Sequence, residues 1–109
     1  MVIPLLVCLL LVISTIPVNA ATYYANSSGK SFSKAWSVTK INTSERTFKY
    51  GYNTTLINED YTHTYHRSYS HSAYVKNSGS AYEKEASKGK YAKAEIQHHS
   101  GTVFYEYNY

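Results

Sequence analysis

The chain has 109 residues, and its 11 lysine and arginine residues outweigh 7 acidic residues to give a formal net charge of +4. This mild basicity favours an anionic surface as partner, but it lacks the dense basic stripe of a nucleic-acid-binding protein. One cysteine rules out an internal disulfide, and the 13 tyrosines must supply much of the core.

Residues 1–20 form an almost unbroken apolar run that ends in Val18-Asn19-Ala20. Small residues at and three before the junction suit signal peptidase, and the apolar core is too short to span a bilayer comfortably. We expect a signal peptide that is cleaved between Ala20 and Ala21, followed by secretion into the extracellular medium. Removal of 20 of the 109 residues leaves 89, enough for one small domain held together by packing alone.

Residues 21–46 are interpreted as a partly flexible N-terminal extension. Residues 21–34 are rich in serine, asparagine and glycine, which is typical of a flexible arm or propeptide. Residues 35–41 and 46–52 alternate with a period of two and are predicted to be strands. The second of these strands would place Phe48, Tyr50 and Tyr52 on one face.

The middle of the chain, residues 60–69, also alternates. One side carries tyrosine and His63, whereas the other carries threonine, His66 and serine. Residues 72–76 continue as a strand up to Asn77-Ser78-Gly79, which predicts a turn.

Residues 80–97 have a composition that suits a helix, but Gly89 lies at their midpoint. Ala92, Ala94 and Ile96 alternate with polar residues, so we expect a hairpin that turns near Gly89. Four lysines of this segment would crowd that hairpin, either as a solvated edge or as an anion-binding group. Residues 102–109 close the chain as a further strand. Regularly spaced strands with glycine turns predict an all-β fold, a small antiparallel β-sandwich.

Three blocks occur in order in the second half of the chain. They are Thr47-Phe-Lys-Tyr-Gly51, His71-Ser-Ala-Tyr-Val75, and Tyr91-Ala-Lys-Ala-Glu-Ile96 followed by the tyrosine-rich residues 104–109. Together these blocks resemble the lactococcin 972 family of bacteriocins. The resemblance covers residues 47–109, and it departs from the family pattern in Phe48 and Tyr91, where tryptophan is common.

The resemblance implies a secreted, non-enzymatic antibacterial protein that needs no cofactor. Its expected target is lipid II, the lipid-linked cell-wall precursor, or another anionic component of the target envelope, and the expected outcome is blocked septum formation in related bacteria. It also implies dedicated membrane and transporter immunity proteins in the producer. A homodimer is compatible with the sequence. Aromatic faces that stack on sugars and basic groups that meet phosphate oxygens suit such a ligand.

The target-binding residues are predicted to lie around the His-Ser-Ala block. Those residues are Tyr65, His66, His71 and Tyr74. A packing role for His71 is the competing interpretation. His63 and His66 are three residues apart, which puts them on opposite faces of a strand, so no metal site and no catalytic residue is predicted. Two other functions remain open from the residues alone: an adhesion or binding module without antibacterial activity, and a histidine-dependent hydrolase.

Overall fold

The computed structural model describes residues 21–109, and these contain eight strands and no helix. The predicted signal peptide, residues 1–20, and Ala20 of the expected cleavage site lie outside the described residues. The strands are β1 (Thr22–Asn26), β2 (Trp36–Asn42), β3 (Arg46–Asn53), β4 (Glu59–His66), β5 (His71–Lys76), β6 (Ala81–Ala86), β7 (Tyr91–Gln97) and β8 (Phe104–Asn108). In this part of the chain no helix has the length and hydropathy needed to cross a membrane.

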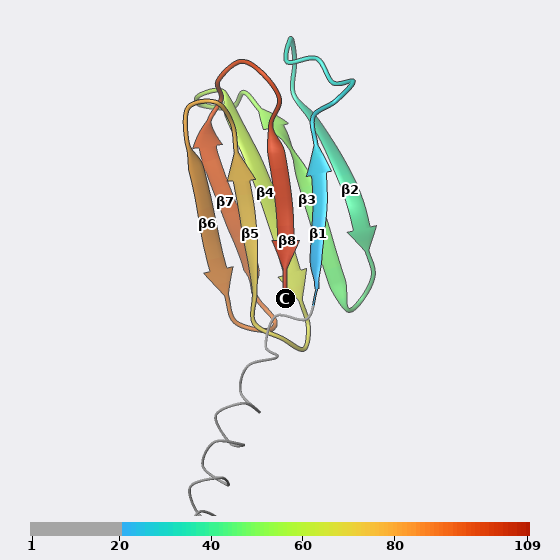
Figure 1. Ribbon diagram of the computed structural model, residues 1–109. Coiled ribbons are helices and arrows are strands. Elements are labelled where there is room, and N and C mark those ends of the chain that lie inside the picture. Colours follow the sequence, from blue (N-terminus) through green and yellow to red (C-terminus); the bar gives the residue numbers. More distant parts are fainter. Residues whose placement is uncertain (1–20) are drawn as a thin grey trace, which may run out of the picture.

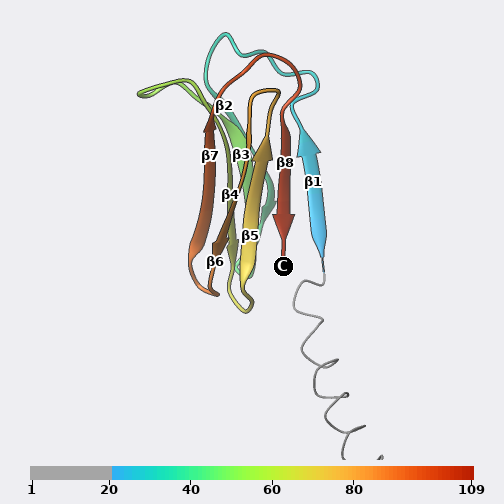
Figure 2. The same ribbon diagram turned by 60° about the vertical axis from the view of Figure 1, so that its left-hand side comes forward.

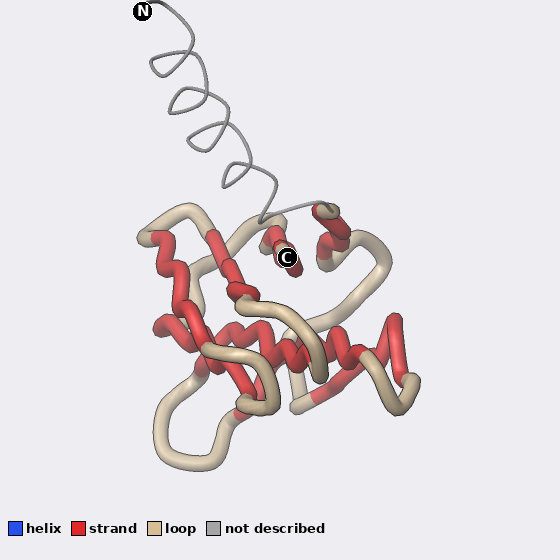
Figure 3. The backbone as a smooth tube through the Cα atoms, turned by 90° about the horizontal axis from the view of Figure 1, so that it is seen from below, coloured by secondary structure: helices blue, strands red, loops and turns tan. Residues whose placement is uncertain are grey.

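The eight strands form two four-stranded antiparallel sheets packed face to face (Figure 1). Sheet A has the order β1-β8-β5-β6, and sheet B has the order β2-β3-β4-β7. The end-on view in Figure 3 shows the two layers with loops joining them at their edges. The predicted all-β antiparallel sandwich is therefore confirmed.

Aromatic side chains fill the space between the sheets. The faces predicted from the alternation of residues 46–52 and 102–109 do point inward, and Phe48, Tyr105 and Tyr107 have no exposed surface. The Tyr50 and Tyr105 rings stack across the two sheets with centroids 4.6 Å apart. On β7 the small residues Ala92 and Ala94 leave room for these rings. Because each tyrosine buries a large area, this core forms with few leucine or isoleucine residues.

In β3 and β8 tyrosines point into the core, whereas in β4 threonines point into the core and tyrosines point outward. Thr62 and Thr64 point into the core and are fully buried, while Tyr65 lies on the outer face of sheet B. Thr62 compensates for its buried hydroxyl by donating a 2.8 Å hydrogen bond to the carbonyl oxygen of Tyr74 in the opposite sheet.

The N-terminal segment 21–46 is part of the sandwich and supplies one strand to each sheet. Strand β1 pairs with β8 from Thr22↔Asn108 to Asn26↔Phe104, and β2 pairs with β3. The sequence boundary at residue 47 thus separates no structural unit. The expectation of an arm outside the domain fails for β1, whose ladder partner lies about 80 residues away in the chain.

The predicted hairpin over residues 80–97 is wrong in its pairing, although both strands and the turn exist. Strand β6 pairs with β5 in sheet A, and β7 pairs with β4 in sheet B, so the chain crosses between sheets at Gly89 (Figure 2). Gly89 has φ +79°, a conformation that costs glycine least, and its N–H donates to the carbonyl oxygen of His66. The lysines of this segment are accordingly divided between the sheets and the turn.

Candidate functional site

The four residues predicted to bind the target do not form one surface. Tyr65 lies on the outer face of sheet B, and Tyr74 lies on the outer face of sheet A, so the full sandwich separates them. His66 and His71 are only 2% and 3% exposed and lie between the sheets. Of the four residues, only Tyr65 and Tyr74 are therefore placed to contact a ligand. Because they lie on opposite sides of the sandwich, one ligand molecule on one face cannot contact both.

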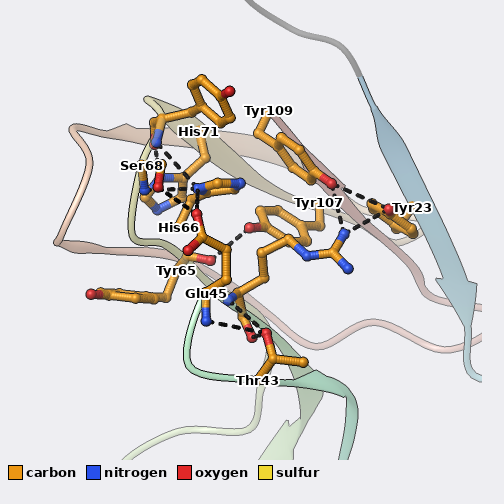
Figure 4. A network of polar contacts seen from close by, with 11 residues as sticks. Tyr23, Thr43, Glu45, Tyr65, His66, Ser68, His71, Tyr107 and Tyr109 are labelled. Carbon is orange, nitrogen blue, oxygen red and sulfur yellow. Dashed lines mark hydrogen bonds and ion pairs between the residues drawn. The ribbon is translucent and has the colours of Figure 1, made fainter.

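His66 organises the turn between β4 and β5. Its Nδ1 accepts hydrogen bonds from the backbone N–H groups of Ser68 (3.0 Å) and Tyr69 (3.1 Å), as Figure 4 shows. Burial, only partly offset by the nearby Glu45 carboxylate, lowers the pKa of His66. The unprotonated ring is thus the form that the turn requires.

His71 has a packing role. Its Nδ1 lies 3.1 Å from the carbonyl oxygen of Tyr69, and its ring meets the Tyr107 ring edge-on with centroids 6.2 Å apart. The competing interpretation from the sequence, a structural histidine, fits this geometry better than a contact residue does.

A second polar cluster near the same end of the sandwich joins β1, β3 and the residue after β8. Arg46 Nη1 donates to the hydroxyls of Tyr23 (2.7 Å) and Tyr109 (2.6 Å), and the guanidinium carbon lies 5.4 Å from the Tyr23 ring centroid (Figure 4). The hydrogen bonds that Tyr23 makes with Tyr109 and Arg46 lower the pKa of the Tyr23 hydroxyl. Through these contacts Arg46 of sheet B is joined to Tyr23 and Tyr109 on the side of sheet A.

The outer face of sheet B carries the arrangement best suited to a ligand with sugars and phosphates. Lys49 of β3, His63 of β4 and Lys93 of β7 are direct cross-strand partners and so form one row. The adjacent row contains Tyr65 and Tyr91, whose ring centroids are 5.2 Å apart. Cross-strand partners project from the same face of a sheet, so the two rows make one surface. We call these five residues the tyrosine–lysine face.

The lysines supply the positive charge of this face. His63 Nε2 lies 2.8 Å from Glu95 Oε2, yet burial outweighs this contact and lowers the pKa of His63, with the two lysines acting in the same direction. Lys93 Nζ lies 6.0 Å from the Tyr91 ring centroid, within range of a cation–π contact. Near neutral pH the row therefore has a neutral imidazole between two ammonium groups.

Two further histidines, His98 and His99, follow directly after β7. His98 Nδ1 lies 2.8 Å from the buried Asp60 carboxylate, a pairing that hydrolases use to orient a base. Phe32 stacks on the His98 ring at 4.3 Å, and in residues 21–109 the ring hydrogen-bonds only to Asp60, so no hydroxyl nucleophile is in place. His99 is exposed. The same residues contain no cluster of three or more histidine, cysteine or acidic side chains suited to a metal ion.

Of the five members of the tyrosine–lysine face, only Tyr65 belongs to the binding set predicted from the sequence. The other four do not, although Lys93 is among the lysines for which an anion-binding role was left open: Lys49, His63, Tyr91 and Lys93. Alternation along β3 and β7 is visible in the sequence and does place Lys49 and Lys93 opposite the core residues. What alternation cannot reveal is that β4 lies between β3 and β7 and brings the two lysines into one row.

Searches of protein-family models, curated proteins and solved structures found no match to this chain. The resemblance described above accordingly rests on its three sequence blocks alone.

Proposed function

We propose that the protein is a secreted antibacterial protein of the lactococcin 972 type, which binds lipid II without catalysis and thereby blocks septum formation in related bacteria. The observation that carries the proposal is the tyrosine–lysine face, where a pair of tyrosine rings lies beside two lysines on one outer surface. The three sequence blocks support the same function, and an all-β sandwich is the fold that the resemblance implies.

The two rows of this face would serve different parts of the precursor. Lys49 and Lys93 are separated by two strand spacings, roughly 9.5 Å between backbones, so their flexible side chains can converge on a diphosphate held above His63. The rings of Tyr65 and Tyr91 offer an apolar surface to a sugar, and their hydroxyls can bond to its polar edges. Binding of this kind sequesters the precursor and requires no bond to be broken.

The test is growth inhibition by the purified protein. A sensitive relative should stop dividing without leaking ions or ATP, and added lipid II should protect it. Tyr91→Ala and Lys93→Ala should each weaken inhibition while leaving the melting temperature unchanged, because both side chains are exposed. Tyr82→Ala and Lys84→Ala on β6 are matched controls away from the face and should retain full inhibition.

Two results would count against the proposal. If Tyr91→Ala and Lys93→Ala inhibit growth as well as the unsubstituted chain, the tyrosine–lysine face does not bind the target. If the protein adheres to cells and never arrests growth, it is an adhesion module, the alternative that the sequence left open.

A further inference from the structure

The outer face of sheet A has a pattern that the proposed function does not use. A single cross-strand row runs over all four strands and alternates aromatic and acidic side chains. In order across the sheet the row contains Tyr24 of β1, Glu106 of β8, Tyr74 of β5 and Glu83 of β6. All four side chains project from the same face, because direct antiparallel partners do so. We call these four residues the acidic aromatic row.

The row runs along a hollowed surface. On one side of the row, a depression of about 420 Å³ is lined by Tyr24, Tyr74 and Glu106 together with Phe104. On the other side, a depression of about 810 Å³ is lined by Glu106 and Glu83 together with Asn108. Tyr24 is 65% exposed and Phe104 is 48% exposed, so the rings are available to a ligand. Glu106 lines both depressions, which flank the acidic aromatic row on either side along the strands, and we call the row with these two depressions the groove.

Hydrogen bonds hold one wall of this groove in place. Thr22 Oγ1 donates to Asn108 Oδ1 (2.8 Å), Asn108 Nδ2 donates to Ser72 Oγ (3.3 Å), and Ser72 Oγ donates to Glu83 Oε2 (2.8 Å). This chain of bonds runs parallel to the acidic aromatic row and orients the carboxylate at its end. A site whose polar groups are positioned before binding loses less entropy when it binds.

The charge of the groove is opposite to that of the whole protein. On the outward-facing positions of the four strands, Glu83, Glu85 and Glu106 outnumber Lys76, which lines the depression beside Tyr24, whereas the chain as a whole carries +4. Lys40 of β2 reaches only the edge of this sheet, where its Nζ donates to the carbonyl oxygen of Tyr24. None of the three carboxylates lies within ion-pair distance of a basic side chain in residues 21–109. Phosphates and other polyanions are therefore repelled here, and a cationic ligand is favoured.

The spacing of the row narrows the ligand class. Like residues in the row recur at every second strand, roughly 9.5 Å apart, for both the tyrosines and the carboxylates. In an extended β-1,4-linked glycan alternate sugar rings are separated by a similar distance and present the same face. A chain of amino sugars would thus set rings over the tyrosines and place ammonium groups beside the carboxylates, where the rings also favour cations.

We infer that the groove on the outer face of sheet A binds a β-linked amino-sugar oligosaccharide with free amino groups. This site is separate from the tyrosine–lysine face and does not depend on the antibacterial proposal. It gives the protein a second ligand, of opposite charge preference, on the opposite side of the sandwich.

The experiment is calorimetric titration of the purified protein with a β-1,4-linked glucosamine hexasaccharide at mildly acidic pH and low salt. We expect saturable binding that weakens about threefold to tenfold in Tyr24→Ala and by a similar factor in Glu106→Gln, from loss of a stacking surface and of one charge. Tyr82→Ala on β6 is the matched control and should bind like the unsubstituted chain. Melting curves of each variant confirm that the fold persists.

Two further ligands separate the contributions of ring and charge. The fully N-acetylated hexasaccharide should bind about tenfold more weakly, and hexalysine should bind weakly and without regard to Tyr24→Ala. Absence of saturable binding by the glucosamine hexasaccharide overturns the inference. The inference is also overturned if hexalysine binds as tightly as the glucosamine hexasaccharide and Tyr24→Ala weakens neither, because the site would then be a nonspecific acidic surface. Equal binding of the acetylated chain with no effect of Glu106→Gln would overturn the assigned charge preference.

Discussion

The Asp60 carboxylate, which has no exposed surface, lies 2.8 Å from Nδ1 of His98 and accepts a 2.9 Å hydrogen bond from Asn77 Nδ2. Asp60→Ala removes the partner of His98 Nδ1 and one of the two acceptors of Asn77 Nδ2, which keeps its 2.8 Å hydrogen bond to the Gln97 carbonyl oxygen. We expect the free energy of unfolding to fall by about 3 kcal/mol, the lower end for a broken buried pair, because the His98 ring can still reach water. Chemical denaturation measures this loss. The neighbouring half-exposed Glu59→Ala should change stability by less than about 0.5 kcal/mol, and equal losses in both variants would contradict the special role of Asp60.

Tyr105 and Tyr107 form a matched pair with which the contribution of a buried hydroxyl to stability can be measured. Both residues lie on β8 and are fully buried, but Tyr107 donates a 2.6 Å hydrogen bond to the Tyr65 carbonyl oxygen, whereas the Tyr105 hydroxyl has no partner in the described residues. Tyr107→Phe should lower the free energy of unfolding by about 0.5–1.5 kcal/mol, and Tyr105→Phe should raise it by about 1 kcal/mol. Denaturant titration of the two variants should show opposite signs, and the same sign in both would refute the argument.

Alkaline pH should unfold the protein. Burial raises the pKa of the Tyr105 and Tyr107 hydroxyls, while in the unfolded chain these groups ionise at about pH 10. The stabilisation is complete below that value and is lost as the pH rises above it, since only the unfolded state can release the protons. Ultraviolet absorbance should show that these two tyrosines ionise together with unfolding. A gradual ionisation of every tyrosine without loss of structure would argue against this.

Acidification should weaken the fold through His63 and His66. Burial lowers both pKa values below the ordinary 6.5, so between the lowered native value and about 6.5 the unfolded state binds more protons. Stability is therefore complete above about pH 6.5 and decreases as the pH falls through this window. Thermal melts at a series of pH values measure the slope. His66→Asn should reduce the slope, and substitution of the exposed His99→Asn should leave it unchanged. An unchanged slope in His66→Asn would show that His66 does not contribute.

Gly51 of β3 should not accept a side chain. A Cβ at this position would lie 2.3 Å from the backbone oxygen of Trp36 and 2.9 Å from the Tyr61 hydroxyl oxygen. Gly51→Ala should therefore lower the free energy of unfolding by about 1–3 kcal/mol, because the backbone of β2 would have to move. At Gly79 the crowding atoms belong to the exposed His99 side chain, which can rotate away, so Gly79→Ala should cost less. Melting curves that rank the two variants in the reverse order would contradict this.

Alternation along single strands predicted much of the fold. Phe48, Tyr50 and Tyr52 point into the core as their period of two requires, and so do Ala92 and Ala94. Strand β1 escaped prediction because it has only five residues within a stretch rich in serine, asparagine and glycine, and its strand conformation depends on hydrogen bonds to β8. Local patterns do not contain that information.

The candidate sites were harder to predict than the strands. Whether two strands that flank a turn pair with each other or enter different sheets depends on contacts far along the chain. Local alternation therefore predicts a hairpin around Gly89, although β6 and β7 enter different sheets. Strand order in turn decides which side chains become neighbours. The order β3-β4-β7 aligns Lys49 with Lys93, and the order β1-β8-β5 aligns Tyr24 with Tyr74. Tyr65 and Tyr74, which were predicted to share one contact surface, lie on opposite sides of the sandwich because a single turn carries the chain from one sheet to the other between them.

The position of β8 between β1 and β5 has a consequence for when the protein can fold. Strand β1 pairs only with β8, whereas β5 also pairs with β6, and the β1 ladder joins residues as far apart as Thr22 and Asn108. Loops of that length close slowly, and sheets built from distant pairs form late. Until β8 has been synthesised, β1 has no ladder partner and the inner face of β5 lacks the Tyr105 and Tyr107 rings. Strands β2, β3 and β4 and the pair β5-β6 join neighbours in the chain, so the addition of β1 to its sheet is the step that depends on the C-terminal strand.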